Sequence, residues 1–275
     1  SKLKINEKLF ISWVGPRGIV AAGIASLFGL ELAHRGFEGA EYITPLVFTV
    51  VLGTVLLNAT TARLFAKVAG VFLTKSDGIF IVGAAEFSRL IGSYLLKNNR
   101  NVVLIDNNQN NVRKSKELGL EAINTDIYSD TLIDNIELSD VGYLMALTGN
   151  TDINNYVITK FSEQFGENGA FRLVSEEEKN NPKNNPEIGL FSHTDDFNSL
   201  DAVSRNYPEI YEIPLNDEEH YKKLIAATEN EPNSIPLFVK DTNGELEIIS
   251  SYQTTIENIG KKWKLVILGK KIKST

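Results

Sequence analysis

The stretch Ile79-Phe80-Ile81-Val82-Gly83-Ala84-Ala85-Glu86-Phe87-Ser88 begins with four apolar residues and then reaches a glycine. This pattern predicts a buried strand, a tight turn and a helix. The alternation continues along the chain, with strands expected at Val102–Ile105, Glu121–Asn124, Tyr143–Leu147 and Phe171–Val174, and helices at Glu86–Asn98, Gln109–Leu118, Asp130–Ile136 and Asp152–Phe165. It predicts a parallel, doubly wound α/β sheet, which binds ligands at the carboxyl ends of its strands.

The first turn keeps one glycine of the dinucleotide-binding pattern Gly-x-Gly-x-x-Gly. Gly83 is present, whereas Ala85 and Ser88 replace the other two glycines. A plain strand-to-helix turn is therefore an alternative. Asp106 ends the second strand, where an acidic group can bind a ribose hydroxyl and disfavours the 2′-phosphate of NADP. Glu86 lies near the helix N-terminus, where its charge repels a phosphate.

Two long apolar segments precede this pattern. Phe10–Leu30 contains one charged residue, Arg17, and Ile43–Ala62 contains none. Each has about 20 residues, enough to cross ~30 Å of hydrocarbon. We expect two transmembrane helices; buried helices of a soluble core are the alternative. Arg17 faces a carboxylate or an aqueous path, or else lies at the interface with its charge in water.

The flanking charges predict the orientation of these helices. Basic residues lie before the first segment and after the second, and the connecting loop is mainly acidic. The positive-inside rule places both ends in the cytoplasm, so residues 71–275 are expected to be cytoplasmic. These basic residues are Lys2, Lys4, Lys8, Arg63, Lys67 and Lys75.

The charge balance and residue types exclude several functions. Residues 1–70 hold seven Lys/Arg and four Asp/Glu, and the rest of the chain holds 21 and 31. An acidic soluble part argues against nucleic acid as a partner. The absence of cysteine excludes disulfides and thiolate metal sites. His34, His193 and His220 lie outside the strand-end loops, so we expect neither an enzyme nor a metal site.

The apolar segments resemble a known family. Trp13-Val14-Gly15-Pro16-Arg17-Gly18-Ile19-Val20 and Thr54-Val55-Leu56-Leu57-Asn58-Ala59-Thr60-Thr61 resemble the closing helices of bacterial monovalent cation:proton antiporters of the sodium/proton exchanger type. The resemblance covers about residues 8–70. It implies that Arg17 belongs to the transport domain and that earlier helices of the same protein, absent here, carry the ion site. Because Ser1 is not a start methionine, we expect a C-terminal fragment of a longer chain.

Residues 77–175 resemble an RCK domain, the nucleotide-sensing module of potassium channels and transporters. The resemblance rests on the Gly83 turn, Val103–Asp106, Asn124–Asp130 and Ala146–Asn154. It implies that Asp106 binds ribose, that Asp126 and Ile127 flank an adenine, and that Thr148 and Asn150 line the cleft. A helix cap or a simple loop acid is the alternative for Asp126. The full implied site is Gly83, Ala84, Ala85, Glu86, Phe87, Ser88, Asp106, Asn107, Asp126, Ile127, Thr148 and Asn150.

The C-terminal region predicts a further small lobe. Ile188–Ser192, a helical stretch near Asp196–Arg205, and Glu209–Pro214 are expected to extend the first sheet. Asp241-Thr242-Asn243-Gly244 predicts a hairpin between two strands. The predicted domains are residues 1–70, a linker at 71–76, a Rossmann-like RCK domain at 77–215 and an α+β lobe at 216–275.

Together these features predict a fragment of a monovalent cation (Na⁺ or K⁺):proton antiporter. Two transmembrane helices of a multi-pass inner-membrane protein precede a cytoplasmic domain that senses NAD(H) or an adenine nucleotide such as AMP or ATP. Lipid, the remaining transmembrane helices and a second copy in a homodimer are the expected partners. The alternatives are an RCK-type scaffold or dimerisation domain without nucleotide, and the regulatory part of a potassium channel or uptake system.

Overall fold

The computed structural model divides the chain into two compact units, Ser1–Thr74 and Lys75–Thr275. It describes residues 5–15, 19–71, 76–129, 140–181, 188–192, 194–250, 256 and 259–272. Arg17, residues 72–75 of the predicted linker, His193 and the predicted helix Asp130–Ile136 lie outside the described residues.

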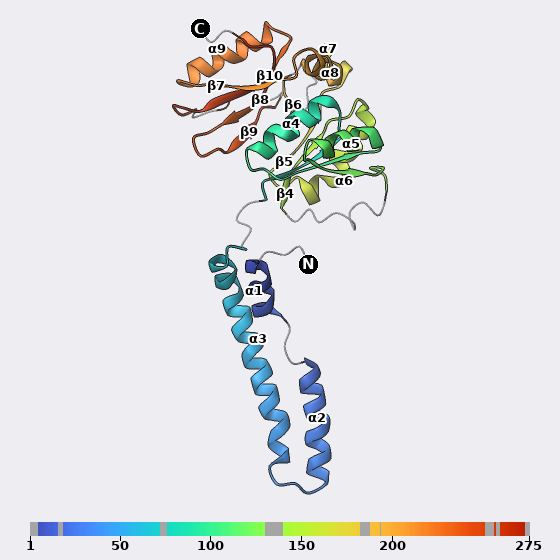
Figure 1. The fold of residues 1–275 in the computed structure, drawn as a ribbon, viewed down its shortest axis with the longest axis vertical. Coiled ribbons are helices and arrows are strands. Elements are labelled where there is room, and N and C mark those ends of the chain that lie inside the picture. Colours follow the sequence, from blue (N-terminus) through green and yellow to red (C-terminus); the bar gives the residue numbers. More distant parts are fainter. Residues whose placement is uncertain are drawn as a thin grey trace. The chain divides into compact units, whose positions relative to one another are not determined.

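The first unit consists of helices (Figure 1). They are α1 (Ile5–Val14), α2 (Ile19–His34), the short 3₁₀ helix η1 (Ala40–Tyr42) and α3 (Ile43–Val68). Both α1 and α2 pack along α3. The indole of Trp13 in α1 donates a hydrogen bond of 3.1 Å to the Thr61 hydroxyl and stacks on Phe65 with ring centroids 5.1 Å apart.

The predicted first span, Phe10–Leu30, is not one continuous helix. α1 ends at Val14 and α2 begins at Ile19. Gly15 directly follows α1, in line with the poor helix propensity of glycine, and residues 16–18 lie outside the described residues. The described helix α2 has 16 residues and a length of about 24 Å.

The predicted second span agrees with α3. Among the described residues, Ala40–Val68 is the one helix long and apolar enough to cross a membrane. None of its most apolar window is buried within the structure.

The second unit begins with a six-stranded parallel sheet in the order β3-β2-β1-β4-β5-β6. This order confirms the predicted doubly wound fold, in which the strand order reverses between β1 and β4. The strands are β1 (Gly78–Val82), β2 (Val102–Asp106), β3 (Glu121–Asn124), β4 (Val141–Ala146), β5 (Gly169–Leu173) and β6 (Gly189–Leu190).

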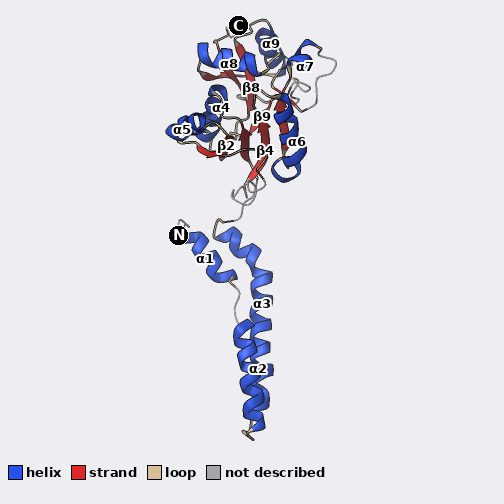
Figure 2. Ribbon diagram, turned by 90° about the vertical axis from the view of Figure 1, so that its right-hand side faces the viewer, coloured by secondary structure: helices blue, strands red, loops and turns tan. Residues whose placement is uncertain are grey.

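Helices cover both faces of this sheet (Figure 2). They are α4 (Glu86–Lys97), α5 (Gln109–Glu117), α6 (Thr151–Phe165), α7 (Glu176–Asn180) and α8 (Phe197–Asn206). Because β1 is buried on both faces, Ile79 and Ile81 pack with α4, while Phe80 and Val82 pack with α6. This double burial explains why the strand is a continuous apolar run.

A four-stranded antiparallel sheet follows in the order β7-β10-β8-β9. The predicted hairpin is confirmed: the Asp241 amide donates to the Glu245 carbonyl between β8 and β9. The prediction that Glu209–Pro214 extends the first sheet is wrong, because β7 pairs with β10. The elements are β7 (Ile210–Pro214), α9 (Glu218–Glu229), β8 (Ser234–Lys240), β9 (Leu246–Ile248) and β10 (Lys264–Gly269).

The second sheet packs between α9 and the parallel-sheet region. Val239, Leu265 and Ile267 share a core with α9, whereas Phe238 and Val266 belong to the core that contains α4 and α8. The apolar alternation along these strands therefore serves two separate cores.

Polar contacts also join the two sheets. Arg100, which is 8% exposed, pairs with Asp77 at 2.6 Å and with Glu245 at 2.7 Å. Asp77 directly precedes β1, and Glu245 lies in the β8–β9 hairpin. Arg100 therefore bonds to the start of the parallel sheet and to the antiparallel sheet.

Glu212 of β7 forms a second polar junction. It accepts hydrogen bonds from Lys264, from Lys240 at 3.1 Å and from the Tyr94 hydroxyl of α4 at 2.8 Å. Burial alone would raise the pKa of Glu212, but these hydrogen bonds outweigh burial and lower the pKa to about 2.

Replacing Glu212 with Gln should lower the free energy of unfolding at pH 7 by on the order of 2 kcal/mol, since each unit of pKa shift corresponds to about 1.4 kcal/mol. The folded pKa of about 2 lies below the ordinary value of 4.5. The contribution of the Glu212 carboxylate to the free energy of unfolding is thus complete above pH 4.5 and is lost as the pH falls toward 2. Urea unfolding followed by Trp263 fluorescence, in a Trp13→Phe background, measures the difference.

Glu209→Gln is the matched control, because Glu209 pairs with Lys271 and both side chains are at least 60% exposed. It should change the free energy by less than about 0.5 kcal/mol. A wild-type-to-variant difference for Glu212→Gln that is the same at every pH would contradict the assignment.

Candidate functional site: a cavity at the strand ends

A cavity of about 280 Å³ opens at the carboxyl ends of β1 to β4. This is the place where the strand order reverses, and where doubly wound sheets bind ligands. The lining residues are Val82, Gly83, Ala85, Ile105, Asp106, Asn107, Asn111, Thr125, Asp126, Ile127, Tyr128, Leu147, Thr148, Gly149, Ile153 and Phe197.

Gly83 determines the path of the first turn. Its φ of +99° lies in a region that L-residues rarely adopt. A Cβ atom at Gly83 would lie 2.8 Å from the carbonyl oxygen of Leu147, which follows β4. Arg89 of α4 holds the next residue by donating a hydrogen bond of 2.5 Å to the Ala84 carbonyl. Glycine is thus required by backbone conformation and by space.

Asp106 organises the cavity from the end of β2. One carboxylate oxygen accepts from the Ala84 amide at 2.8 Å and from the Asn111 side chain at 3.0 Å. The other accepts from the Asn108 amide at 2.7 Å. An ionised carboxylate has about four acceptor positions, so one remains for a ligand hydroxyl.

The loops after β3 and β4 complete the walls. The Asp126 carboxylate accepts from the Tyr128 amide at 3.0 Å and so stabilises its own turn. The Thr148 hydroxyl donates to the buried Asn154 side chain at 2.7 Å, and Asn154 returns a hydrogen bond to the Thr148 carbonyl. The β4 loop is therefore held in place from within α6.

The structure brings together seven of the predicted nucleotide-site residues. Gly83, Ala85, Asp106, Asn107, Asp126, Ile127 and Thr148 line the cavity.

The other five predicted residues lie outside the lining. Ala84 is buried, with its amide on Asp106. Glu86 is exposed on the first turn of α4, while Phe87 and Ser88 are fully buried. Asn150 caps α6 by accepting from the amides of Asp152 and Ile153.

Several lining residues were not predicted. Asn111 lies in the first turns of α5, close enough to Asp106 in sequence to be inferred from the strand–helix pattern. Phe197 comes from α8, more than ninety residues after β2, and no local pattern in the sequence marks it. Tyr128, Gly149 and Ile153 each lie next to a predicted residue or one turn beyond it.

The cavity is negatively charged. Its charged lining residues are Asp106 and Asp126, and no Lys or Arg is among the described residues that line it. A ligand with several phosphates would find backbone amides there and no cationic side chain.

Residues 79–182 match the family model of the TrkA-N domain. This part of the chain is a TrkA-N domain. No curated protein matches the chain. The TrkA-N domain contributes β1 to β5 and all four strand ends of the cavity.

Solved structures of low similarity also align with the chain. Staphylococcus aureus N5-carboxyaminoimidazole synthetase aligns at 14% identity and a TM-score of 0.27, over 71% of this chain and 47% of that chain. The GsuK channel bound to NAD aligns at 13% identity and a TM-score of 0.28, over 97% of this chain and 58% of that chain. Another GsuK channel structure aligns at 12% identity and a TM-score of 0.32, over 98% of this chain and 58% of that chain. The chain thus spans about half of the length of these proteins.

Gly83→Ala should destabilise the TrkA-N domain by at least about 2 kcal/mol, because the added methyl meets a backbone carbonyl in a strained conformation. Gly119→Ala is the matched control: its φ is +78° but nothing lies within 4 Å of the added atom. It should cost about 1 kcal/mol. If urea unfolding shows that both variants lose the same free energy of unfolding, the contact with Leu147 does not constrain the turn.

Proposed function

We propose that the TrkA-N domain binds the nucleoside part of NAD(H) or an adenine nucleotide and regulates a membrane transport system for monovalent cations. The observation that carries this proposal is the Asp106 carboxylate at the cavity, where one acceptor position remains free. A ribose hydroxyl is a suitable donor for that position.

The remaining walls suit an adenosine group. Ile105 and Ile127 give apolar surface on the β2 and β3 side. Asp126 and Thr125 offer polar groups at the edge of that surface. The negative charge of Asp106 disfavours a ribose 2′-phosphate, so NADP should bind less tightly than NAD.

Asp106→Asn should weaken nucleotide binding at least tenfold, because a hydrogen bond to a charged group contributes about 1.5–3 kcal/mol. Calorimetric titration of the full chain with AMP, ATP, NAD⁺ and NADH measures the affinity. Glu163→Gln, an exposed carboxylate of α6, removes the same charge away from the cavity and should leave the affinity unchanged.

The main alternative is a scaffold or dimerisation domain without a ligand. It predicts no heat with any of the four nucleotides, and an Asp106→Asn variant that behaves as the wild type. We further propose that the domain is not catalytic, that it forms a homodimer, and that residues 71–275 are cytoplasmic.

Two different parts of the chain support two different proposals for the transport system. The TrkA-N match supports the regulatory part of a potassium channel or uptake system. The antiporter proposal, with Arg17 inside the transport domain, rests on the resemblance of residues 8–70 alone. In both cases α3 would be one helix of a multi-pass inner-membrane protein.

Regulation through a short linker makes a specific prediction. In inverted membrane vesicles that contain the whole protein, the bound nucleotide should change the flux of Na⁺ or K⁺. A flexible Gly-Ser insert at residues 71–76 should remove this response and leave nucleotide affinity unchanged, because a longer linker no longer transmits a shift in domain packing. An insert of equal length between Asn243 and Gly244, in the β8–β9 hairpin, is the control.

A persisting response in the linker variant would contradict this mechanism. The same vesicles distinguish the two transport systems: cation-dependent proton movement supports an antiporter, and potassium flux without proton exchange supports a channel or uptake system.

A further inference from the structure

Phe197 forms the wall of the cavity on the β4 side. Its ring packs over Gly149, where an added Cβ would come within 3.3–3.4 Å of three ring carbons. A second contact is with Phe87 in the first turn of α4, at a centroid distance of 5.4 Å and a near-perpendicular angle between the two rings. The ring therefore contacts both the first turn of α4 and the loop after β4.

This position matters because a dinucleotide crosses the point where the strand order reverses, with one nucleoside on each side. In this chain the β2 and β3 side has the free acceptor position of Asp106 and the apolar surface of Ile127. The β4 side has the ring of Phe197. The volume of about 280 Å³ is at the small end of ligand sites, which are about 300–1,000 Å³.

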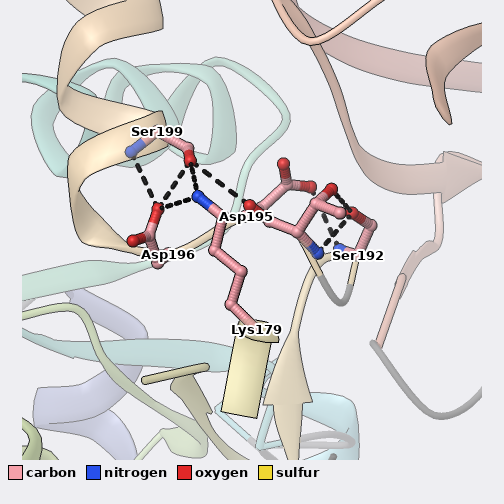
Figure 3. Close-up of polar contacts among 6 residues, drawn as sticks. Lys179, Ser192, Asp195, Asp196 and Ser199 are labelled. Atoms are coloured by element: carbon pink, nitrogen blue, oxygen red, sulfur yellow. Dashed lines mark hydrogen bonds and ion pairs between the residues drawn. The ribbon is translucent and has the colours of Figure 1, made fainter. Parts of the chain in front are cut away.

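The Phe197 wall is anchored by polar contacts at the start of α8. Asp196 caps the helix by accepting from the Ser199 amide at 3.0 Å, and Lys179 of α7 pairs with Asp196 at 3.0 Å. Figure 3 shows the Lys179 amine directed at both Asp196 and Ser199. Burial opposes ionisation of Asp196, but the hydrogen bonds of Ser199 and Lys179 outweigh it and lower the Asp196 pKa.

The rest of α8 is fixed by packing. Leu200 and Val203 are buried in the core shared by both sheets. A Cβ at Gly269, at the end of β10, would lie 2.7 Å from a Val203 methyl. This packing fixes the position of α8, and the backbone of Phe197 with it.

The charges around the cavity, like its small volume, favour a small ligand with few phosphates. Asp106 and Asp126 line the cavity, Glu86 is exposed at the start of α4, and the described lining contains no cationic side chain. Each added phosphate would increase a repulsion that no cationic side chain among the described lining residues offsets.

We propose that the cavity selects a mononucleotide with a single phosphate, and that Phe197 is the residue that excludes the second nucleoside of a dinucleotide. This inference rests on the proposed nucleotide-binding function and identifies the ligand class within it.

The test compares AMP with NAD⁺ by calorimetric titration of the full chain. Wild type should bind AMP at least tenfold more tightly than NAD⁺. Phe197→Ala should reduce this ratio at least tenfold by strengthening NAD⁺ binding, with AMP affinity changed less than threefold. Phe171→Ala, another half-buried ring on the same core but outside the cavity, should leave the ratio unchanged.

Lys179→Met provides a second variant, since it removes the anchor of Asp196 and keeps the Phe197 side chain. It should shift the ratio in the same direction by a smaller factor. If Phe197→Ala fails to fold, Lys179→Met alone decides the inference.

The outcomes separate this inference from the proposed function. No binding of AMP, NAD⁺ or the other nucleotides by wild type would overturn the proposed function itself. Wild type that binds NAD⁺ as tightly as AMP, or variants that weaken both ligands equally, would overturn the role of Phe197 and leave nucleotide binding in place.

Discussion

The hydrogen bond from the Ala84 amide to the Asp106 carboxylate joins the ends of two neighbouring strands of the parallel sheet, β1 and β2. It requires the chain to turn sharply after Val82, which the left-handed conformation of Gly83 allows. The same carboxylate fixes the start of α5 through Asn108 and Asn111. One charged group thus positions the first turn, the second strand end and the following helix around the cavity.

The parallel sheet could be predicted because its signals are local. Strand and helix periods alternate from residue 79 onward. That alternation predicts a ligand site at Gly83 and Asp106, and both residues line the cavity. Phe197 could not be predicted, since α8 reaches the cavity only after the whole sheet has formed. The pairing of β7 with β10 was missed for a similar reason: Ile210–Pro214 is a short strand whose partner lies some fifty residues later.

The membrane-like region illustrates another limit of sequence patterns. Hydropathy treats Phe10–Leu30 as one segment because it sums apolar residues over a window. The structure describes two helices in this segment, α1 up to Val14 and α2 from Ile19, and residues 16–18 lie outside the described residues. The segment Ala40–Val68 has no proline after Pro45, in the first turn of α3, and forms a long helix.

The Arg100 contacts give the second unit a shared point of attachment. Asp77, at the edge of β1, and Glu245, in the outer hairpin, are held by the same guanidinium. The Asn168 side chain donates a hydrogen bond of 2.5 Å to the carbonyl of Ser76, the residue before Asp77. Separating the two sheets along this edge would break the ion pair between Arg100 and Glu245 and bring a guanidinium that is 8% exposed into water. The carboxylate that directly precedes β1 therefore shares its cationic partner with the antiparallel sheet, so the place where the chain enters the parallel sheet senses whether the second sheet is docked.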